Sequence, residues 1–284
     1  MTYSLLRRPA LNEPVLISAL SGWVDAASAG TNAALHLAAE GEVVAEFDGD
    51  LLFDYRSQRP ILDIVDGVMQ KTVWPEVNVR HSVIDDRDVL VMSGSEPDLG
   101  WRRFATGVAQ LAQDLGVAQL ITLGSVPAAV PHTLPAPIMT TASDASLLHG
   151  DVRPPDGLLR VPAAAVSIVD QSVAGVGIST VGFFVQVPHY VSGNYPSAVL
   201  ALLRRVATQL GISIPLGDLL DEEATHRRHL DEVVAEQPEA QEHVTALEKM
   251  NADQKSISGE ELASEIERYL RDASPGDRGP REEQ

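Results

Sequence analysis

A run of acids, arginines and one tyrosine at residues 48–60 is the strongest candidate for chemistry in this sequence. It reads Asp-Gly-Asp-Leu-Leu-Phe-Asp-Tyr-Arg-Ser-Gln-Arg-Pro, and no hydrophobic period explains the order of its side chains. Carboxylate, guanidinium and phenol groups gathered on a loop are suited to charge-assisted hydrogen bonds with a ligand or with another subunit. The run therefore predicts a binding site or a subunit contact, with candidate residues Asp48, Asp54, Tyr55, Arg56 and Arg59.

Two chemistries compete for the charged groups of this loop. Asp48, Asp50 and Asp54 supply the oxygen ligands that hard cations take, but their spacing is not that of an EF-hand loop and its terminal Glu is missing. We therefore expect no metal site. Arg56 and Arg59 have paired donors that suit a phosphate or a carboxylate, and they can equally pair with the acids of the loop. Because acids outnumber arginines locally, we favour an internal network of acids and arginines.

A second polar cluster follows an expected strand and opens an expected helix. It begins Glu-Pro-Asp-Leu-Gly-Trp-Arg-Arg-Phe at Glu96. A carboxylate beside a helix N-terminus is stabilised by the helix dipole, so capping accounts for Asp98. Capping does not account for Glu96, Trp101 and Arg102, which we expect at the same edge of the sheet as the charged loop. We therefore hypothesise one crevice shared by the two segments.

Three loops that follow expected strands carry the remaining candidates. Asp25 stands where the first strand passes into a helix, where it can face a ligand or, as we favour, cap helix amides. Ser125 and His132 share a loop rich in Gly and Pro, which suggests a hydrolase. However, there is no Gly-x-Ser-x-Gly elbow, and we favour a buried or capping role for His132. His189 ends a later strand and could join His132 in a metal or acid–base pair, although no His-Glu-x-x-His motif supports one.

Sequence motifs for nucleotide cofactors are missing. There is no Walker loop, and the glycine-containing stretch at 175–180 lacks the third glycine of a dinucleotide-binding fingerprint. We expect no cofactor.

The expected elements place these loops on an α/β scaffold. The stretch 117–123 is almost entirely apolar and directly follows a helix pattern, which is typical of a parallel sheet covered on both faces. We therefore predict a mainly parallel central sheet flanked by helices. Strands are expected at 15–20, 43–47, 77–83, 89–92 and 117–123, alternating stretches at 163–169 and 181–187, helices at 25–39, 101–115 and 196–210, and a proline-rich rigid loop at 125–137.

The last quarter of the chain differs in composition from the rest. Residues 218–284 hold 19 acidic against 8 basic residues. Apolar spacing predicts a helix over 218–250, and a Ser-x-x-Glu capping pattern predicts another over 258–271. We predict an α/β core domain at 1–216, a helical extension at 217–273 and a disordered tail at 274–284.

Composition restricts the partners. A net charge of −19 argues against nucleic acid or an anionic membrane surface as a partner. The chain has no cysteine, which excludes thiol catalysis and thiolate metal sites, and only three lysines, Lys71, Lys249 and Lys255. No apolar run approaches a membrane span and no secretory signal is visible, so we expect no membrane insertion and a cytoplasmic location.

Five strings along the chain carry a resemblance to a known family. GWVDA, FDGDLLFDYRSQRP, EPDLGWRRF, LGSVPAAVPHT and VQVPHY, in this order, resemble the proteasome assembly chaperone two family in its actinobacterial branch. The acidic helical extension is also similar to that branch. The resemblance implies an α/β fold of the kind seen in nucleoside phosphorylases and related hydrolases, and a tendency to form homo-oligomers, a trimer among them. It implies no established reaction.

The leading hypothesis for function is a non-catalytic protein-binding or assembly factor that forms homo-oligomers. Its helical extension would contact a protein partner. The alternative is a nucleoside phosphorylase-like or hydrolase-like enzyme acting on a small metabolite, which rests on fold analogy. The crevice of that enzyme would be lined by Asp25, Asp54, Arg56, Glu96, Arg102 and His132.

Overall fold

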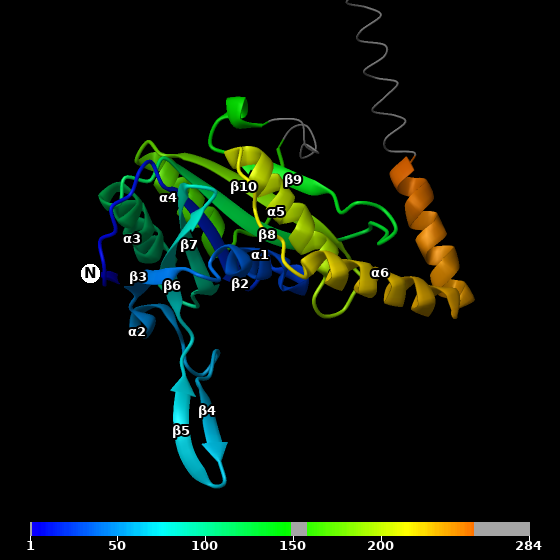
Figure 1. The fold of residues 1–284 in the computed structure, drawn as a ribbon, viewed down its shortest axis with the longest axis horizontal. Coiled ribbons are helices and arrows are strands. Elements are labelled where there is room, and N and C mark those ends of the chain that lie inside the picture. The colour runs from blue at the N-terminus through cyan, green and yellow to red at the C-terminus, as the bar shows by residue number, and fades with distance from the viewer. Residues whose placement is uncertain (1, 149–157, 253–284) are drawn as a thin grey trace, which may run out of the picture. The chain divides into compact units, whose positions relative to one another are not determined.

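The structure, a computed structural model, describes residues 2–148 and 158–252, which fall into two compact units. The first unit ends at Asp231 and contains the sheets and nearly all of the helices that surround them (Figure 1). The second unit begins at Glu232, and its described part is helical, with a helix over 238–252. The predicted helix at 258–271 and the predicted tail at 274–284 lie outside the described residues.

An eight-stranded sheet forms the centre of the first unit. Its strand order is β1-β3-β6-β7-β2-β8-β10-β9. The four inner strands β7, β2, β8 and β10 run parallel, and the outer strands join them antiparallel. The strands are β1 (Tyr3–Leu5), β2 (Val15–Ser21), β3 (Glu42–Phe47), β6 (Val77–Ile84), β7 (Arg87–Ser95), β8 (Gln119–Ala128), β9 (Ile138–Ala142) and β10 (Ser179–Pro188). The predicted α/β class with parallel strands at its centre is confirmed.

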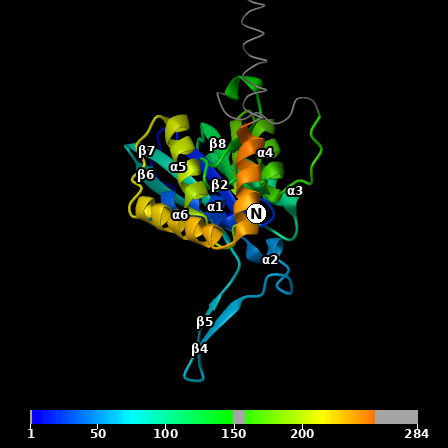
Figure 2. The ribbon, with the colours of Figure 1, turned by 90° about the vertical axis from the view of Figure 1, so that its right-hand side faces the viewer.

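Helices cover both faces of this sheet because the inner strands are apolar on both sides. Along β2, Val15 and Ile17 pack with α1 and α5, whereas Leu16 and Leu20 pack with α3 and α4. Figure 2 shows the helices on the two sides of the sheet. The helices are α1 (Ala29–Leu37), α2 (Gly49–Leu52), α3 (Trp101–Asp114), α4 (Ala165–Gly175), α5 (Pro196–Leu210) and α6 (Leu219–Ala235), with single turns η1 (Ala26–Ser28) and η2 (Ala145–Leu147).

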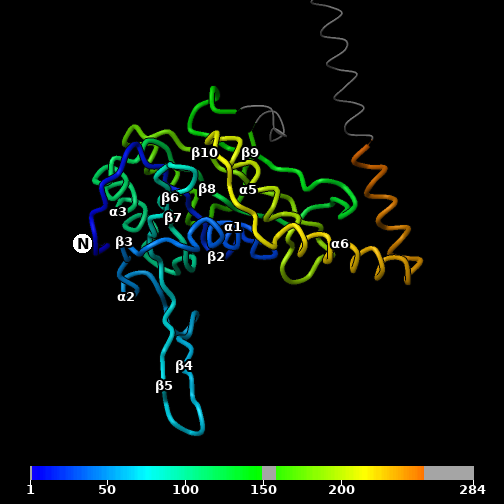
Figure 3. The backbone as a smooth tube through the Cα atoms, in the orientation of Figure 1, coloured from blue at the N-terminus to red at the C-terminus, as the bar shows by residue number. Residues whose placement is uncertain are grey.

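A second, two-stranded sheet leaves the body as a hairpin, visible in the backbone trace of Figure 3. It consists of β4 (Ile61–Val65) and β5 (Val68–Val73), and every residue of both strands is exposed. The turn between them has positive φ at Asp66 (51°) and Gly67 (79°), as the favoured two-residue hairpin turns require. We call residues 61–74 the arm.

Most predicted elements of the α/β part are confirmed, with two corrections. The stretch 163–169 was expected to alternate like a strand, and this prediction was wrong, because α4 begins at Ala165 within it. The buried residues of α4 follow a helical period that continues beyond position 169: Ala165, Val166, Val169 and Val173. The expected loop at 125–137 begins too early, since β8 continues to Ala128, with Pro127 opposite Val187 of β10. Short elements, namely β1, β9, α2 and the arm, were not predicted.

Within the described residues, no helix is both long enough and apolar enough to span a bilayer.

The carboxyl of Asp170, on α4, contacts the face of the large sheet that this helix covers. The fully buried hydroxyl of Thr122, on β8, donates to Oδ1 of Asp170, on α4, over 2.5 Å. Burial raises the pKa of the Asp170 carboxyl to about 7, because desolvation disfavours its charged form. A carboxyl whose pKa is raised by folding lowers stability as the pH rises from the unfolded value towards the folded value.

We therefore expect Asp170→Asn to stabilise the protein at pH 8 by about 2 to 4 kcal/mol, since the amide oxygen still accepts from Thr122 and carries no charge. The gain should shrink as the pH falls towards 4. Urea unfolding of the variant and the wild type at several pH values measures it. Asp144→Asn is the control: hydrogen bonds from Ser146 lower the pKa of Asp144, so this change should give no gain. Equal effects of Asp170→Asn at pH 8 and pH 5 would contradict the assignment.

Candidate functional site

The carboxylate of Glu96 joins three segments at the carboxyl ends of the parallel strands. Glu96 directly follows β7, and its amide donates to Ser21 O at the end of β2 (2.9 Å). Its Oε2 accepts from the Trp23 amide (3.1 Å), and its Oε1 accepts from the amide of Ala165, the first residue of α4 (2.7 Å). Helix N-termini have unpaired amides that favour negative charge. Glu96 therefore stabilises both a strand end and a helix start.

The two clusters predicted from the sequence lie against each other. Leu99 N donates to Leu52 O (3.0 Å), and the amide of Asp54 donates to Oδ2 of Asp98 (3.0 Å). The side-chain amide of Gln58 donates to Glu96 O (2.9 Å). The charged loop and the segment that begins at Glu96 are thus brought together, as the shared-crevice hypothesis requires. Whether they bind a ligand or another subunit stays a prediction.

The acids of the charged loop bind backbone amides rather than arginines. Asp48 accepts from Asp50 N and caps α2, and Asp54 accepts from Arg56 N (2.9 Å). The Tyr55 hydroxyl donates to Asp50 Oδ1 (2.7 Å), and this bond is the main reason that the pKa of Tyr55 rises to about 12. In the described part of the chain, Arg56 and Arg59 form no ion pair with these acids. The predicted acid–arginine network was wrong because the nearer amides already satisfy the carboxylates.

Exposed cations and one aromatic complete this pair of segments. Arg56, Arg59 and Arg102 are all exposed. Trp101 is partly buried against the core, and its indole N–H donates to Pro97 O (2.5 Å). Trp101 therefore fixes the start of α3.

Ser125 and Asp25 have structural partners. The fully buried hydroxyl of Ser125 donates to Ala26 O (2.7 Å). Asp25 accepts from the amide (3.1 Å) and the hydroxyl of Thr31, in the first turn of α1, which agrees with the favoured capping interpretation. A Cβ on Gly30 would lie 3.0 Å from Leu123 O, so glycine lets α1 approach β8 closely here. Ser125 thus donates to a carbonyl and not to a general base.

His132 connects the loop after β8 to α6. Its side chain is buried, with Nδ1 2.7 Å from the Tyr190 hydroxyl and Nε2 3.2 Å from Oδ1 of Asp231. Arg227, one turn earlier on α6, donates to Thr133 O (2.6 Å). The exposed ring of His189 also contacts Tyr190 edge-on, with ring centroids 5.6 Å apart. The two predicted histidines are therefore linked through a tyrosine, and we call His132, Tyr190, Asp231 and Arg227 the α6 latch.

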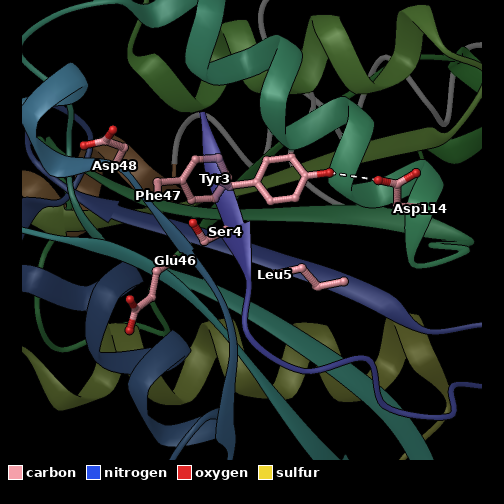
Figure 4. Close-up of a pocket in the computed structure, with 7 residues that line it drawn as sticks. All are labelled: Tyr3, Ser4, Leu5, Glu46, Phe47, Asp48 and Asp114. Atoms are coloured by element: carbon pink, nitrogen blue, oxygen red, sulfur yellow. Dashed lines mark hydrogen bonds between the residues drawn. The ribbon is translucent and has the colours of Figure 1, made fainter. Parts of the chain in front are cut away.

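Two open grooves lie elsewhere, beside the edge strand β1. One has a volume of about 670 Å³ and is lined by Tyr3, Ser4, Leu5, Glu46, Phe47, Asp48 and Asp114 (Figure 4). We call it the β1 groove. A neighbouring groove of about 480 Å³ shares Glu46, Phe47 and Asp48 with it and reaches Tyr55 and Trp74. Sequence reasoning found Asp48 and Tyr55 but missed Tyr3, Glu46 and Asp114, because these residues are far apart in the chain and belong to no motif.

Across residues 2–148 and 158–252, no three His, Asp or Glu side chains are grouped so that they could hold a metal ion.

Comparisons with known proteins give a consistent result. The model of the PAC2 family matches residues 19–234. A Mycobacterium tuberculosis protein of unknown function is 36% identical, with 89% of this chain and 92% of that chain covered and a TM-score of 0.83. A proteasome-assembly chaperone homologue of the same organism is 34% identical (81% and 99% covered, TM-score 0.74), and a PAC2 family protein from Streptomyces avermitilis is 31% identical (81% and 99%, TM-score 0.73). No functionally curated protein matches the chain.

Removal of the Glu96 carboxylate should destabilise the fold. We expect Glu96→Ala to lower the free energy of unfolding by about 1 to 3 kcal/mol, because two amides lose a charged acceptor. Chemical denaturation measures the change. Glu42→Ala is the matched control, since Glu42 pairs with Arg7 on the exposed surface and such pairs contribute at most about 1 kcal/mol. Equal losses in the two variants would show that Glu96 does not hold these segments.

The protein should lose stability in acid through His226. His226, on α6, has a pKa below its ordinary value, mainly because it is partly buried and also because His229 and His132 are near, while Glu223 acts in the opposite sense. The unfolded chain then binds the proton more readily, so stability falls as the pH drops through about 6.5. His226→Gln should reduce the fall in melting temperature between pH 7.5 and pH 5.5, and His229→Gln should reduce it less. An unchanged fall in His226→Gln would refute this role.

Proposed function

The chain belongs to the PAC2 family, and we propose that it is a non-catalytic protein-binding factor of the assembly-chaperone type that forms homo-oligomers. Support comes from the relative described as a proteasome-assembly chaperone homologue, which is 34% identical and is covered over 99% of its length. In this proposal the partners are proteasome subunits and the protein acts in the cytoplasm.

The observation that carries the proposal is the exposed apolar surface of the arm. Ile61, Met69 and Trp74 are 65%, 72% and 52% exposed. Five further large apolar side chains of the arm are exposed as well: Leu62, Ile64, Val65, Val68 and Val73. An isolated two-stranded hairpin is at best marginally stable in water, and a contiguous exposed apolar patch is typical of a protein interface.

The use of the polar residues also favours binding over catalysis. Ser125 donates to a main-chain carbonyl, Glu96 accepts from two main-chain amides, and His132 contacts Tyr190 and Asp231. Each of these side chains hydrogen-bonds to a group that holds the fold together, and none of the three bonds to another of the three. A general base must lie within hydrogen-bond reach of its nucleophile, and these three residues hydrogen-bond to other groups instead.

The helical extension offers a second contact for a partner. Glu232, Glu236 and Glu239 are exposed, and an acidic helix suits a basic surface on a partner. A variant that ends after Ala235 keeps the α6 latch, because Arg227 and Asp231 remain. This truncation therefore removes the rest of the extension and leaves the residues of the α6 latch in place.

The test mixes the purified full chain with separately purified actinobacterial proteasome α and β subunits. We expect saturable binding to assembly intermediates and faster ring formation on native gels, and an oligomer by light scattering. The variant that ends after Ala235 should stay oligomeric and bind the subunits more weakly. A monomer with no binding to the subunits, together with a saturable thermal shift by a nucleoside or phosphorylated metabolite, would overturn the proposal in favour of an enzyme.

A further inference from the structure

We propose that the β1 edge of the large sheet binds an extended, basic segment of a different protein, which adds to the sheet as a further strand. This inference rests on the proposed function as a protein-binding factor and names the chemistry of one partner segment. Three features of the chain support it: the open main-chain edge of β1, the β1 groove beside that edge, and the charge of the residues that line the groove.

β1 leaves one side of its main chain open. It is the terminal strand of the sheet and, in the described part of the chain, pairs only with β3. Leu6 N donates to Val44 O (2.8 Å), and the bonds between antiparallel strands recur at every second residue. The main-chain N–H and C=O groups of Tyr3 and Leu5 therefore point away from β3. Extended peptides bind to other proteins by adding a strand to an open edge of this kind.

The register of β1 on β3 presents two different faces to an added strand. Ser4 lies opposite Glu46, with no register shift between the two strands, so these side chains share a face. Tyr3 and Leu5 lie on the other face because side chains alternate along a strand. Figure 4 shows this division, and Leu5 is 39% exposed. An added strand would therefore place one set of its side chains beside a carboxylate and the alternate set beside an apolar side chain.

The residues around this edge are acidic. Arg8 donates to the main-chain oxygen of Asp114 (3.1 Å) and offsets one negative charge. Among residues 2–148 and 158–252, no hydrogen bond or ion pair engages the carboxylate of Glu46. Five exposed acids line the β1 groove and the neighbouring groove of about 480 Å³, no lysine or arginine lines either groove, and no ion pair in the described residues involves these acids: Glu46, Asp48, Asp50, Glu76 and Asp114.

This charge selects a basic strand as the occupant. A lysine or arginine side chain on the Glu46 face would form a charge-assisted hydrogen bond with an acceptor that the chain itself does not use. The surrounding acids would also speed the association of a basic segment and repel an acidic one. A strand that alternates basic and apolar residues therefore matches both faces of the β1 edge.

The chain itself does not supply such a strand. A second β1 edge would bring the same set of carboxylates against the first. The arm has one lysine against Asp63 and Asp66, and residues 253–284 hold nine acidic against five basic residues. Each of these contacts would oppose like charges, so the occupant is a segment of a different protein.

Synthetic peptides test the strand addition directly. The probe is a fluorescent eight-residue peptide of alternating lysine and valine, and its binding to the full chain is measured by fluorescence anisotropy. We expect saturable binding, and none of the corresponding glutamate–valine peptide. Two further lysine–valine peptides are N-methylated, one at its valines and the other at its lysines, which blocks opposite edges of the strand. Because strand addition uses one edge only, one of them should bind at least about tenfold more weakly than the other. Equal affinities of the two methylated peptides would overturn strand addition.

Variants of the chain test the position of the site. Leu5→Pro removes an outward amide of β1, and an open strand edge tolerates proline, so this change should weaken binding at least about tenfold. Leu5→Ala keeps the amide and should stay within about threefold of the wild type. Glu46→Gln should weaken binding at least about threefold, whereas Glu239→Gln, at an exposed acid of the helical extension, should leave it unchanged. Circular dichroism confirms that each variant is folded.

The outcomes separate this inference from the proposed function. Peptide binding that Leu5→Pro and Glu46→Gln leave unchanged would overturn the assignment to the β1 edge. If proteasome subunits bind the chain but the lysine–valine peptide does not, this inference fails and the proposed function stands. If the peptide binds as expected and the subunits do not, the β1 edge is a docking site and the proposed partner is wrong.

Discussion

The hydrogen bonds of Glu96 are the interactions on which the arrangement of the sheet edge depends. The main-chain amide of Glu96, at the end of β7, donates to Ser21 at the end of β2. Its carboxylate accepts from the amides of Trp23, in the turn after β2, and Ala165, at the start of α4. A Cβ on Gly22 would lie 2.5 Å from Oε2 of Glu96, so the turn after β2 must also be glycine to come this close. The charged loop attaches to the same segment, through the bond from Gln58 to the main-chain oxygen of Glu96, so this segment holds the two polar clusters together.

The amide bonds of the charged loop explain why its composition suggested more chemistry than its geometry offers. Asp48 and Asp54 accept from amides only two residues ahead, which is the local pattern that short acidic side chains form in turns. Such bonds leave the arginines of the loop exposed. Acids that shape a loop and arginines that face solvent produce the same composition as an ion-pair network, so the residue types alone do not separate the two.

How much the sequence predicts depends on whether the signal is local. The helix at Pro196–Leu210 was predicted residue for residue, because Pro at its start and Gly211 after its end are local signals. α4 was not predicted because residues 163–169 contain too few turns to show its helical apolar period, which becomes clear only with Val173. The β1 groove was missed for a different reason, since Tyr3, Glu46 and Asp114 come together only through strand pairing and helix packing. The role of Glu96 also depends on tertiary structure, because the amides that donate to its carboxylate, those of Trp23 and Ala165, lie far away in the chain.

The full exposure of the arm strands bears on how related chains in one cell could avoid forming mixed oligomers. None of the described core clusters includes a side chain of the two arm strands, and every residue of these strands is exposed, so their identities can change with little effect on the packing of the core. Surfaces that are free of packing constraints can diverge quickly and in step with whatever they bind. Two members of the family expressed together could therefore avoid mixed assemblies by small differences in the arm, with no change to the body of either protein.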